Sequence, residues 1–393
     1  MKYFFRLLIC TLTFSSILFA DWTNLRGPNY NGSYQEAKIN FKGRLSKKWE
    51  LNHGKACSAP VILDGIVINS GNKNDIDYVV AVNLKDGKEK WRFEYPCKLH
   101  AKSFEGGPRA TPLIHKGYIY TFSWDGKLHC LNFKNGKKIW SVDVQKKYKG
   151  VPPRWGYSGS PYITNNKLFL DIGGPSHSTL CLDAKTGKLI WGIGNTGAGY
   201  SQPIYYKQNI LILNKAKRVI GFDYKTKKEL WSLDWNISYD VHASMPTIIG
   251  DKLLLSSGYG DGRAALYDIK GKQPKELWKN SQIKTKMNSC TIYKDLIFGV
   301  SERGGAFAAK LGSGEILWKN KCSRKFGTLI VVNDILVIIS DKGLVTLSKA
   351  APQFEEITTA QPFKERCWVT PVYSDGVLLF KSNNGQVVAY DFK

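Results

Sequence analysis

The sequence predicts an all-β fold, an eight-bladed β-propeller of four-stranded antiparallel blades whose ring is closed by an N-terminal strand. A phrase ending in tryptophan recurs with spacings of 49, 51, 40, 47 and 40 residues, at Trp91, Trp140, Trp191, Trp231, Trp278 and Trp318. Short runs of alternating apolar residues lie between these tryptophans, separated by turn signals, and helical periodicity is nearly absent. A repeat of this length built from strands is typical of propeller blades.

The first twenty residues are typical of an export signal. Lys2 and Arg6 form a positively charged start, residues 7–19 are apolar, and Ala20 is a small residue after which we expect cleavage. The apolar stretch is too short to cross a bilayer as a helix. We therefore expect a periplasmic or secreted protein without a transmembrane segment. Residues 21–44 would form an N-terminal extension, and residues 45–393 the propeller.

The second blade shows the strand pattern most clearly. After an opening at residues 110–117, alternating runs follow at 118–122, 127–133 and 138–142. Asp125-Gly126 and Asn135-Gly136 separate these runs, and such dipeptides favour tight hairpin turns. Each blade is therefore expected to be an up-and-down sheet of four strands.

The blade opening consists of a small residue before Pro or Thr, followed by an apolar run. It occurs eight times, at residues 58–60, 110–112, 159–161, 201–203, 244–246, 289–291, 327–328 and 369–371. The eighth blade has only three strands before the chain ends, whereas the run at 45–51 precedes the first opening and has no blade of its own. Pairing this run with the eighth blade would close the ring and remove two exposed sheet edges.

The tryptophans are assigned to the core of the propeller. Within the phrase at residues 182–191, Asp183 and Gly187 shape the hairpin between the third and fourth strands, and Trp191 would pack between neighbouring blades. The same structural role is expected at Trp49, Trp91, Trp140, Trp231, Trp278 and Trp318.

The composition supports a folded, basic protein. The chain has 393 residues, of which 43% are hydrophobic and 13% aromatic, which excludes disordered, collagen-like and coiled-coil classes. Lys and Arg number 57 against 32 Asp and Glu, giving a net charge of +25 that favours anionic partners. Apart from Cys10 in the apolar leader, the cysteines are odd in number and lack CxxC spacing. This pattern argues against a zinc site and against a complete disulfide framework, and the pairing of any one or two disulfides stays open.

The repeated Asp-Ala-Lys-Thr-Gly-Lys-Leu-Ile-Trp phrase and the paired openings resemble the PQQ-like β-propeller repeat family. That superfamily includes the quinoprotein alcohol dehydrogenases and the outer-membrane protein assembly lipoprotein. The start of the expected mature chain, Trp22 to Gly32, is similar to the segment that opens many exported bacterial members. The resemblance covers residues 22–393 and concerns blade scaffolding, so it implies the fold more than a function.

The resemblance also raises the question of a quinone cofactor. In the dehydrogenases it implies PQQ on the propeller axis with calcium, a catalytic Asp and a disulfide between adjacent cysteines. This chain has no adjacent cysteines, and no Asp or calcium-ligand set aligns. PQQ with calcium is therefore an alternative that the site residues do not support.

The segments before each first strand would line a funnel at one end of the axis. Cations and tryptophans gather in these segments and would hold an anionic or planar ligand by charge-assisted hydrogen bonds and stacking. The alternative is that they are solvated loop residues. The candidates are Arg109, Arg154, Trp155, His242, Lys286, Asn288, Lys325, Arg366 and Trp368.

Lysines concentrate in the hairpins between third and fourth strands, which a propeller places on one face. Such a face would dock on anionic lipid, lipopolysaccharide or an acidic protein, unless these are simply soluble turn residues. Nucleic acid is not an expected partner, because no recognition module is present. The lysines are Lys85, Lys88, Lys90, Lys134, Lys137, Lys138, Lys185, Lys188, Lys225, Lys227, Lys228, Lys270, Lys272 and Lys275.

These observations favour a monomeric, non-catalytic scaffold that binds an envelope protein or an anionic ligand or surface. A PQQ-dependent oxidoreductase with a divergent site is the alternative. A polysaccharide-binding or lyase-like protein is a third class, although no paired carboxylate signature supports it.

Overall fold

The computed structural model describes residues 21–35, 41–102, 104–302, 305–323 and 326–392. The expected signal peptide lies outside these ranges. Within them, no helix is long and apolar enough to cross a membrane. The seven cysteines in this part of the chain are all free.

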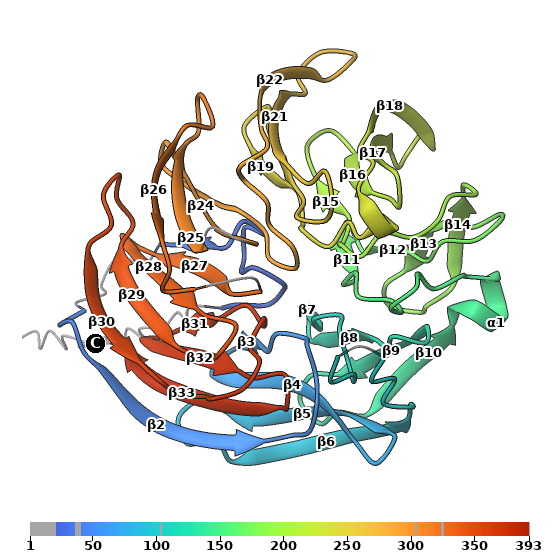
Figure 1. Cartoon of the computed structure of the whole chain (residues 1–393). Coiled ribbons are helices and arrows are strands. Elements are labelled where there is room, and N and C mark those ends of the chain that lie inside the picture. The colour runs from blue at the N-terminus through green and yellow to red at the C-terminus, as the bar shows by residue number, and fades with distance from the viewer. Residues whose placement is uncertain (1–20, 36–40, 103, 303–304, 324–325, 393) are drawn as a thin grey trace, which may run out of the picture.

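The strands form eight sheets that stand around a common axis (Figure 1). In each blade the neighbouring strands are antiparallel, and consecutive strands run outwards from the axis. The first four blades contain β3 (Val61–Leu63), β4 (Ile66–Lys73), β5 (Ile76–Asn83), β6 (Glu89–Pro96); β7 (Leu113–His115), β8 (Tyr118–Phe122), β9 (Lys127–Asn132), β10 (Lys138–Asp143); β11 (Tyr162–Thr164), β12 (Lys167–Asp171), β13 (Thr179–Asp183), β14 (Leu189–Ile193); and β15 (Ile204–Tyr205), β16 (Ile210–Asn214), β17 (Arg218–Asp223), β18 (Lys228–Asp234).

The second half of the ring repeats this arrangement. Its complete blades contain β19 (Thr247–Ile249), β20 (Lys252–Ser256), β21 (Ala264–Asp268), β22 (Lys275–Asn280); β23 (Thr291–Tyr293), β24 (Leu296–Ser301), β25 (Gly305–Lys310), β26 (Ile316–Asn320); and β27 (Thr328–Val332), β28 (Ile335–Ile339), β29 (Val345–Lys349), β30 (Glu356–Ala360). Two short helical turns, α1 (Val144–Tyr148) and η1 (Ser238–Asp240), follow blades two and four.

The ring closes as the sequence predicts. The eighth blade takes β31 (Val372–Ser374), β32 (Val377–Lys381) and β33 (Gln386–Phe392) from the C-terminal part of the chain and its outer strand β2 (Leu45–Asn52) from the N-terminal part. Figure 1 shows β2 along β33. The eight-bladed, four-stranded architecture is therefore confirmed, with one addition, since β1 (Ser33–Tyr34) pairs in parallel with β27.

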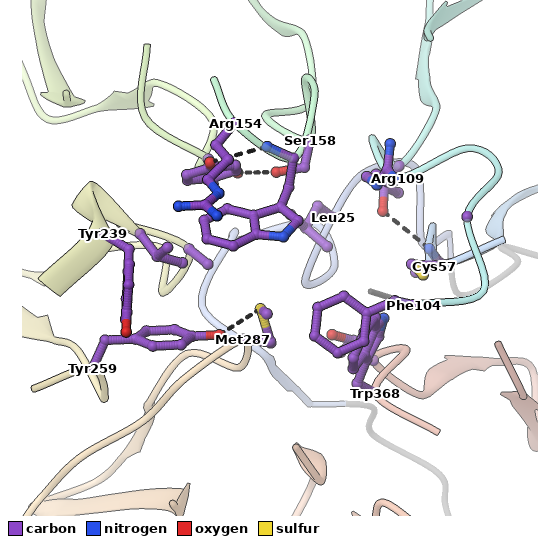
Figure 2. Close-up of a pocket in the computed structure, with 18 residues that line it drawn as sticks. Leu25, Cys57, Phe104, Arg109, Arg154, Ser158, Tyr239, Tyr259, Met287 and Trp368 are labelled. Carbon is purple, nitrogen blue, oxygen red and sulfur yellow. Dashed lines mark hydrogen bonds between the residues drawn. The ribbon is translucent and has the colours of Figure 1, made fainter. Parts of the chain in front are cut away.

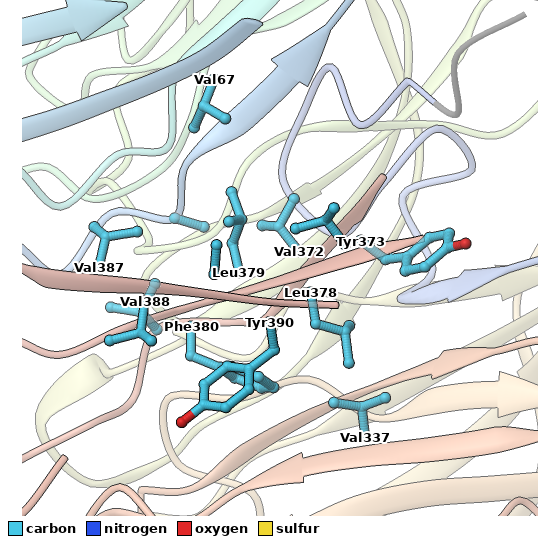
Figure 3. Packing of buried hydrophobic residues seen from close by; sticks show 14 of the residues in the cluster. Val67, Val337, Val372, Tyr373, Leu378, Leu379, Phe380, Val387, Val388 and Tyr390 are labelled. Atoms are coloured by element: carbon cyan, nitrogen blue, oxygen red, sulfur yellow. The ribbon is translucent and has the colours of Figure 1, made fainter. Parts of the chain in front are cut away.

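The closing blade is fixed by apolar packing on both sides. Its inner strands alternate side chains between two faces, so that Leu379 and Val387 belong to one row and Leu378 and Phe380 to another (Figure 3). One buried cluster joins these residues to Val67 of blade one and to blade seven. Burial of a continuous core across the seam holds the two ends of the chain together.

The blade tryptophans connect each blade to the next. The indole of Trp140 in blade two lies against Gly187 in the hairpin of blade three, where an added Cβ would come within 2.7 Å of it. The Trp140 indole also donates to the Ala184 carbonyl at 3.1 Å. Trp278 makes the same contacts with Gly314 and the Leu311 carbonyl of blade six. Because it has no Cβ, the glycine adopts the positive φ that the hairpin requires and leaves space for the indole.

A β-bulge precedes each of these tryptophans in the fourth strand. In blade two Lys138 and Trp140 pair with Leu131 and Cys130, so Ile139 between them has no partner in the neighbouring strand. The bulge points Trp140 towards the next blade and turns the extra residue outwards.

Residues 22–34, which we call the axial segment, run through the centre of the ring. Trp22 exchanges two backbone hydrogen bonds with Ile62 of blade one, at 2.9 and 2.8 Å, and its side chain is 1% exposed. Tyr34 packs against Tyr373 of blade eight with ring centroids 5.6 Å apart. The axial segment therefore belongs to the propeller core, although the sequence places it in an extension.

Arg26 fixes the middle of the axial segment. Its guanidinium is 4% exposed and donates to the Thr247 hydroxyl of blade five at 3.0 Å, to the Asn31 carbonyl at 2.7 Å, and to the Cys290 carbonyl beside blade six. Burial lowers the pKa of Arg26 to about 10. These hydrogen bonds compensate for taking a charged group out of water.

Candidate binding funnel

Two sets of loops emerge at the same end of the propeller, because adjacent strands alternate in direction. These are the segments that lead into each first strand and the loops between second and third strands. They surround a cavity of about 320 Å³ (Figure 2). Its lining consists of Leu25, Cys57, Ala59, Phe104, Gly106, Arg109, Thr111, Arg154, Trp155, Ser158, Tyr200, Tyr239, Val241, Ala243, Tyr259, Met287, Trp368 and Thr370.

The axial segment closes the cavity from below. Leu25 lines the funnel, whereas Asp21 and Tyr34 meet first-to-second-strand turns at the other end of the axis. There Asp64 donates its backbone N–H to the Asp21 carboxylate at 3.2 Å, and Asn333 donates to the Tyr34 carbonyl at 2.8 Å. The funnel is therefore a pocket with an apolar floor and not an open channel.

Arg109 and Arg154 supply positive charge from two parts of the lining, Arg154 near Ser158 and Arg109 near Cys57 (Figure 2). Arg109 donates to the His100 carbonyl at 3.0 Å, while its other terminal nitrogen, Nη1, is buried without a partner among the described residues. Arg154 lies over the Trp155 indole, 5.1 Å from the ring centroid. Neither arginine forms an ion pair with a carboxylate in the part of the chain that the structure describes.

The positive charges of Arg109 and Arg154 have no carboxylate partner to neutralise them among the described residues. Burial lowers the pKa of Arg109 from its usual value. Burial also raises the pKa of Tyr200 to about 12, although the charges of Arg109 and Arg154 act in the opposite direction. An anion that binds either arginine would gain charge-assisted hydrogen bonds without displacing a carboxylate.

Aromatic side chains form the remaining walls. On one side Phe104 packs edge-on against Trp368, with ring centroids 4.7 Å apart. On the other side Tyr239 stands edge-on to Tyr259 at 6.4 Å, and the Tyr259 hydroxyl lies 3.9 Å from the Met287 sulfur. Figure 2 shows these two groups facing each other across the cavity. Such walls suit the apolar or planar body of a ligand.

The other predicted cations are already paired. Arg366 forms an ion pair with Glu105 at 2.9 Å, and Lys286 forms one with Glu302 at 2.5 Å. The Lys286 ammonium also lies 4.8 Å from the Tyr259 ring centroid. These residues surround the mouth of the funnel without lining the cavity, and their charge is largely neutralised.

Two other candidates are structural in this geometry. His242 is 2% exposed, its Nδ1 lies 3.0 Å from the Asn214 side-chain oxygen, and burial lowers its pKa to about 4, which keeps the imidazole neutral. Asn288 is buried and donates to the Gly327 carbonyl at 2.7 Å. Both hold loops of neighbouring blades together. Lys325 lies outside the described residues.

Of the nine predicted funnel residues, the structure places Arg109, Arg154, Trp155 and Trp368 in the cavity lining. Tyr259 and Leu25 also line the cavity, although neither belongs to a segment before a first strand. Tyr259 lies in a loop between second and third strands, and the alternation of strand direction indicates that such loops reach the funnel end. Leu25 reaches the funnel from the axial segment, and no sequence signal indicates its position.

The fold and the pocket define a class of protein, an eight-bladed propeller of PQQ-like repeats with a funnel at one end of its axis. A family model described as outer membrane protein assembly factor BamB matches residues 46–150 and 75–320. The chain belongs to this family of PQQ-like repeat propellers.

Curated relatives match only in part. A quinohemoprotein alcohol dehydrogenase of Pseudomonas putida is 26% identical over 159 residues, which are 38% of this chain and 21% of that protein. The assembly factor BamB of Shewanella oneidensis is 23% identical over 251 residues, 59% of this chain and 62% of that protein. The chain thus spans about a fifth of the dehydrogenase's length.

Solved structures share the fold. BamB of Moraxella catarrhalis superposes with a TM-score of 0.67 at 17% identity, covering 89% of this chain and 98% of that one. The quinohemoprotein alcohol dehydrogenase of Comamonas testosteroni gives 0.71 at 12% identity, covering 95% and 80%. At these identities the likeness concerns the architecture alone.

The funnel lining fits part of what a quinoprotein dehydrogenase requires. Its two arginines and aromatic walls suit a planar polyanion such as PQQ. The lining contains no Asp or Glu, however, so neither a carboxylate base nor an acidic calcium ligand faces the cavity among the described residues. Nor does that part of the chain hold any group of three or more His, Cys, Asp or Glu able to bind a metal.

Proposed function

We propose that the protein is a non-catalytic binding protein of the cell envelope whose axial funnel takes a small anionic ligand with an aromatic or apolar body. One observation carries the proposal: Arg109 and Arg154 lie on the wall of an aromatic pocket without carboxylate partners among the described residues. The leader-like start of the sequence supports a periplasmic or secreted location.

The two chemical parts of the ligand follow from the two parts of the pocket. Its carboxylate or phosphate would bind the guanidinium groups of Arg109 and Arg154, both of which line the cavity. Its body would lie between the Phe104–Trp368 pair and the Tyr239–Tyr259 pair, above Leu25. The closed floor limits the length of ligand that enters.

Binding is tested with naphthalene-2,6-dicarboxylate, a planar dianion that has no redox chemistry of its own. Calorimetric titration compares the wild-type protein with Arg109→Gln, Arg154→Gln and the double variant. A hydrogen bond to a charged group contributes about 1.5–3 kcal/mol, so each single change should weaken binding by about 10- to 100-fold.

The matched control is Arg218→Gln, which removes an exposed arginine that pairs with Glu229 on blade four. This variant should bind like the wild-type protein, because Arg218 is not among the residues that line the cavity. Equal affinity of the wild-type protein and the double variant would refute the site. A similar loss in Arg218→Gln would show that only the net charge matters.

A PQQ-dependent oxidoreductase is the second candidate, favoured by the planar, cationic pocket. The two candidate functions are distinguished by adding PQQ and calcium to the protein and measuring whether a dye is reduced when an alcohol or sugar is supplied as substrate. Binding of PQQ without turnover agrees with the proposal. Turnover that is lost in the Arg109→Gln and Arg154→Gln double variant would replace it with the enzymatic function.

A further inference from the structure

We propose that the face opposite the funnel, along blades two to five, docks on an anionic lipid surface. This face, which we call the turn face, carries the turns between first and second strands and the hairpins between third and fourth strands. The turn face lies at the other end of the molecule from the funnel, and its residues do not contact the proposed ligand. It combines unpaired lysines with outward-turned apolar side chains, and the exposed apolar bulge residues are confined to one arc of the ring.

The hairpin lysines of blades two to five are free to bind anions. Lys137, Lys188, Lys228 and Lys275 represent one such residue per blade, and each is exposed. None of them forms an ion pair in the part of the chain that the structure describes. Their charges therefore extend from the turn face without an internal counter-ion.

In blades six to eight, lysines at the end of the third strand or in the outer strand pair with carboxylates, whereas the blade-one hairpin lysines Lys85, Lys88 and Lys90 form no ion pair among the described residues. In blade six Lys310 pairs with Glu315 at 2.7 Å, and in blade seven Lys349 pairs with Glu355 at 2.5 Å. In blade eight Lys48 pairs with Asp391 at 3.1 Å. The hairpin position of Lys137 and Lys188 is a glutamate in blades six and seven, Glu315 and Glu355, so these two blades present no uncompensated positive charge there.

The bulges add apolar side chains to the charged arc. The bulge residue precedes the tryptophan and has no partner in the neighbouring strand, as Ile139 and Ile190 show. Exposed apolar bulge residues occur in four consecutive blades, which are Ile139 at 47%, Ile190 at 44%, Leu230 at 41% and Leu277 at 43%. Each lies within the first three residues of its strand, next to the lysine hairpin.

The same bulge position is not exposed and apolar in the other blades. It is half-buried in blades six and seven, at Leu317 and Ile357, and is a lysine in blades one and eight, at Lys90 and Lys48. A general requirement of the bulge for an exposed apolar residue would have appeared in all eight blades. Exposed apolar residues at the bulge position are therefore specific to blades two to five.

The inner turns of this arc carry further apolar side chains. Tyr205 in blade four is 38% exposed and Ile249 in blade five is 39% exposed, and both end first strands at the turn face. Among the large exposed hydrophobic residues that the structure describes, only Val151 and Tyr239 lie elsewhere. Exposed apolar surface is thus concentrated beside exposed positive charge.

An anionic membrane suits this combination better than other anionic partners. Lysine side chains reach phosphate headgroups, while neighbouring isoleucine and leucine side chains enter the apolar boundary beneath them. Nucleic acid offers phosphates without an apolar layer at that depth. Docking by this arc would leave the funnel facing away from the lipid and open to its ligand.

The test measures partitioning to vesicles of phosphatidylglycerol and phosphatidylcholine in equal parts, with pure phosphatidylcholine vesicles as reference. Since a lysine near an anionic surface contributes on the order of 1 kcal/mol, changing Lys137, Lys188, Lys228 and Lys275 together to Gln should lower partitioning at least about tenfold. The matched control changes Lys47, Lys48, Lys310 and Lys349 to Gln, with the same change in net charge, and should retain most of the binding.

The apolar part is tested separately by changing Ile139, Ile190, Leu230 and Leu277 together to Ser, with Val151→Ser as control. Partitioning that survives high salt in the wild-type protein should be lost in this variant alone. Circular dichroism of each variant verifies the fold. Equal losses in the two lysine sets, or no salt-resistant binding, would overturn the proposal. So would binding through these lysines to an acidic protein but not to vesicles.

Discussion

Replacing Trp22 with Ala should destabilise the whole propeller, although this residue precedes the first blade by almost forty positions. Its side chain is 1% exposed and belongs to the cluster that spans blades one, seven and eight. Truncation of a buried aromatic to Ala costs about 3–5 kcal/mol, because apolar contacts are lost and a cavity remains. The backbone bridge to Ile62 would persist, so the loss comes from the side chain.

The assay is thermal unfolding followed by circular dichroism at one fixed scan rate. With an unfolding entropy of about 2.1 cal/mol/K per residue, a loss of about 3–5 kcal/mol lowers the Tm of a chain of roughly 360 ordered residues by about 4–7 °C. Asn29→Ala is the control, since Asn29 is an exposed residue of the same axial segment. It should change stability by no more than about 0.5 kcal/mol.

A Trp22→Ala protein that melts with the Asn29→Ala control would refute this reasoning. The axial segment would then be an appendage of the ring, and the floor of the funnel would lose its structural basis. A shift in the Trp22 variant alone would agree with a segment that joins the blades.

Three further changes follow from buried groups. Burial raises the pKa of Asp77 from 3.8 to about 6, so the native state holds the proton of this carboxyl group more tightly than the unfolded state does. The free energy of unfolding that this group contributes should be present below pH 4 and decline by about 3 kcal/mol as the pH rises to 6. Asp77→Asn should remove this decline, which urea titrations at several pH values measure. Asp171→Asn should lower the free energy of unfolding by about 3–5 kcal/mol, because it leaves the buried ammonium group of Lys215 without its ion-pair partner. Replacing Asp171 with Leu and Lys215 with Met together should lower it less, and equal losses of stability would contradict this explanation. Gly187→Ala should destabilise more than Gly117→Ala, since both have positive φ but only Gly187 lies against an indole, and equal unfolding midpoints would rule out the packing role of Trp140.

The sequence predicts the architecture well because each repeat carries the residues that determine its own turns and its contact with the next blade. The hairpin glycines and the tryptophans specify the same turn and the same interblade contact in successive blades, and the surplus strand at 45–51 has one place to pair. The axial segment could not be predicted in this way. Its contacts are single and non-local, such as Arg26 to Thr247, and no periodicity marks them.

The funnel was predicted only in part for a related reason. The position of a residue before a first strand indicates the end of the propeller at which it lies, as for Arg109 and Trp368. It does not indicate whether the side chain points to the axis, packs between blades as His242 does, or pairs with a carboxylate as Arg366 does. Those outcomes depend on neighbouring loops whose conformations the repeat does not determine.

The measurement that tests the central claim most directly is the rate at which Cys57 is alkylated with and without naphthalene-2,6-dicarboxylate. Cys57 lines the funnel, whereas Cys322 lies outside the lining, and both thiols are partly exposed. Burial raises the pKa of each thiol to about 11, and each labelling rate is compared with that of the same thiol without ligand. A ligand in the funnel should slow labelling of Cys57 and leave Cys322 unchanged. Saturating ligand that slows neither thiol, or both equally, would contradict binding between Arg109 and Arg154.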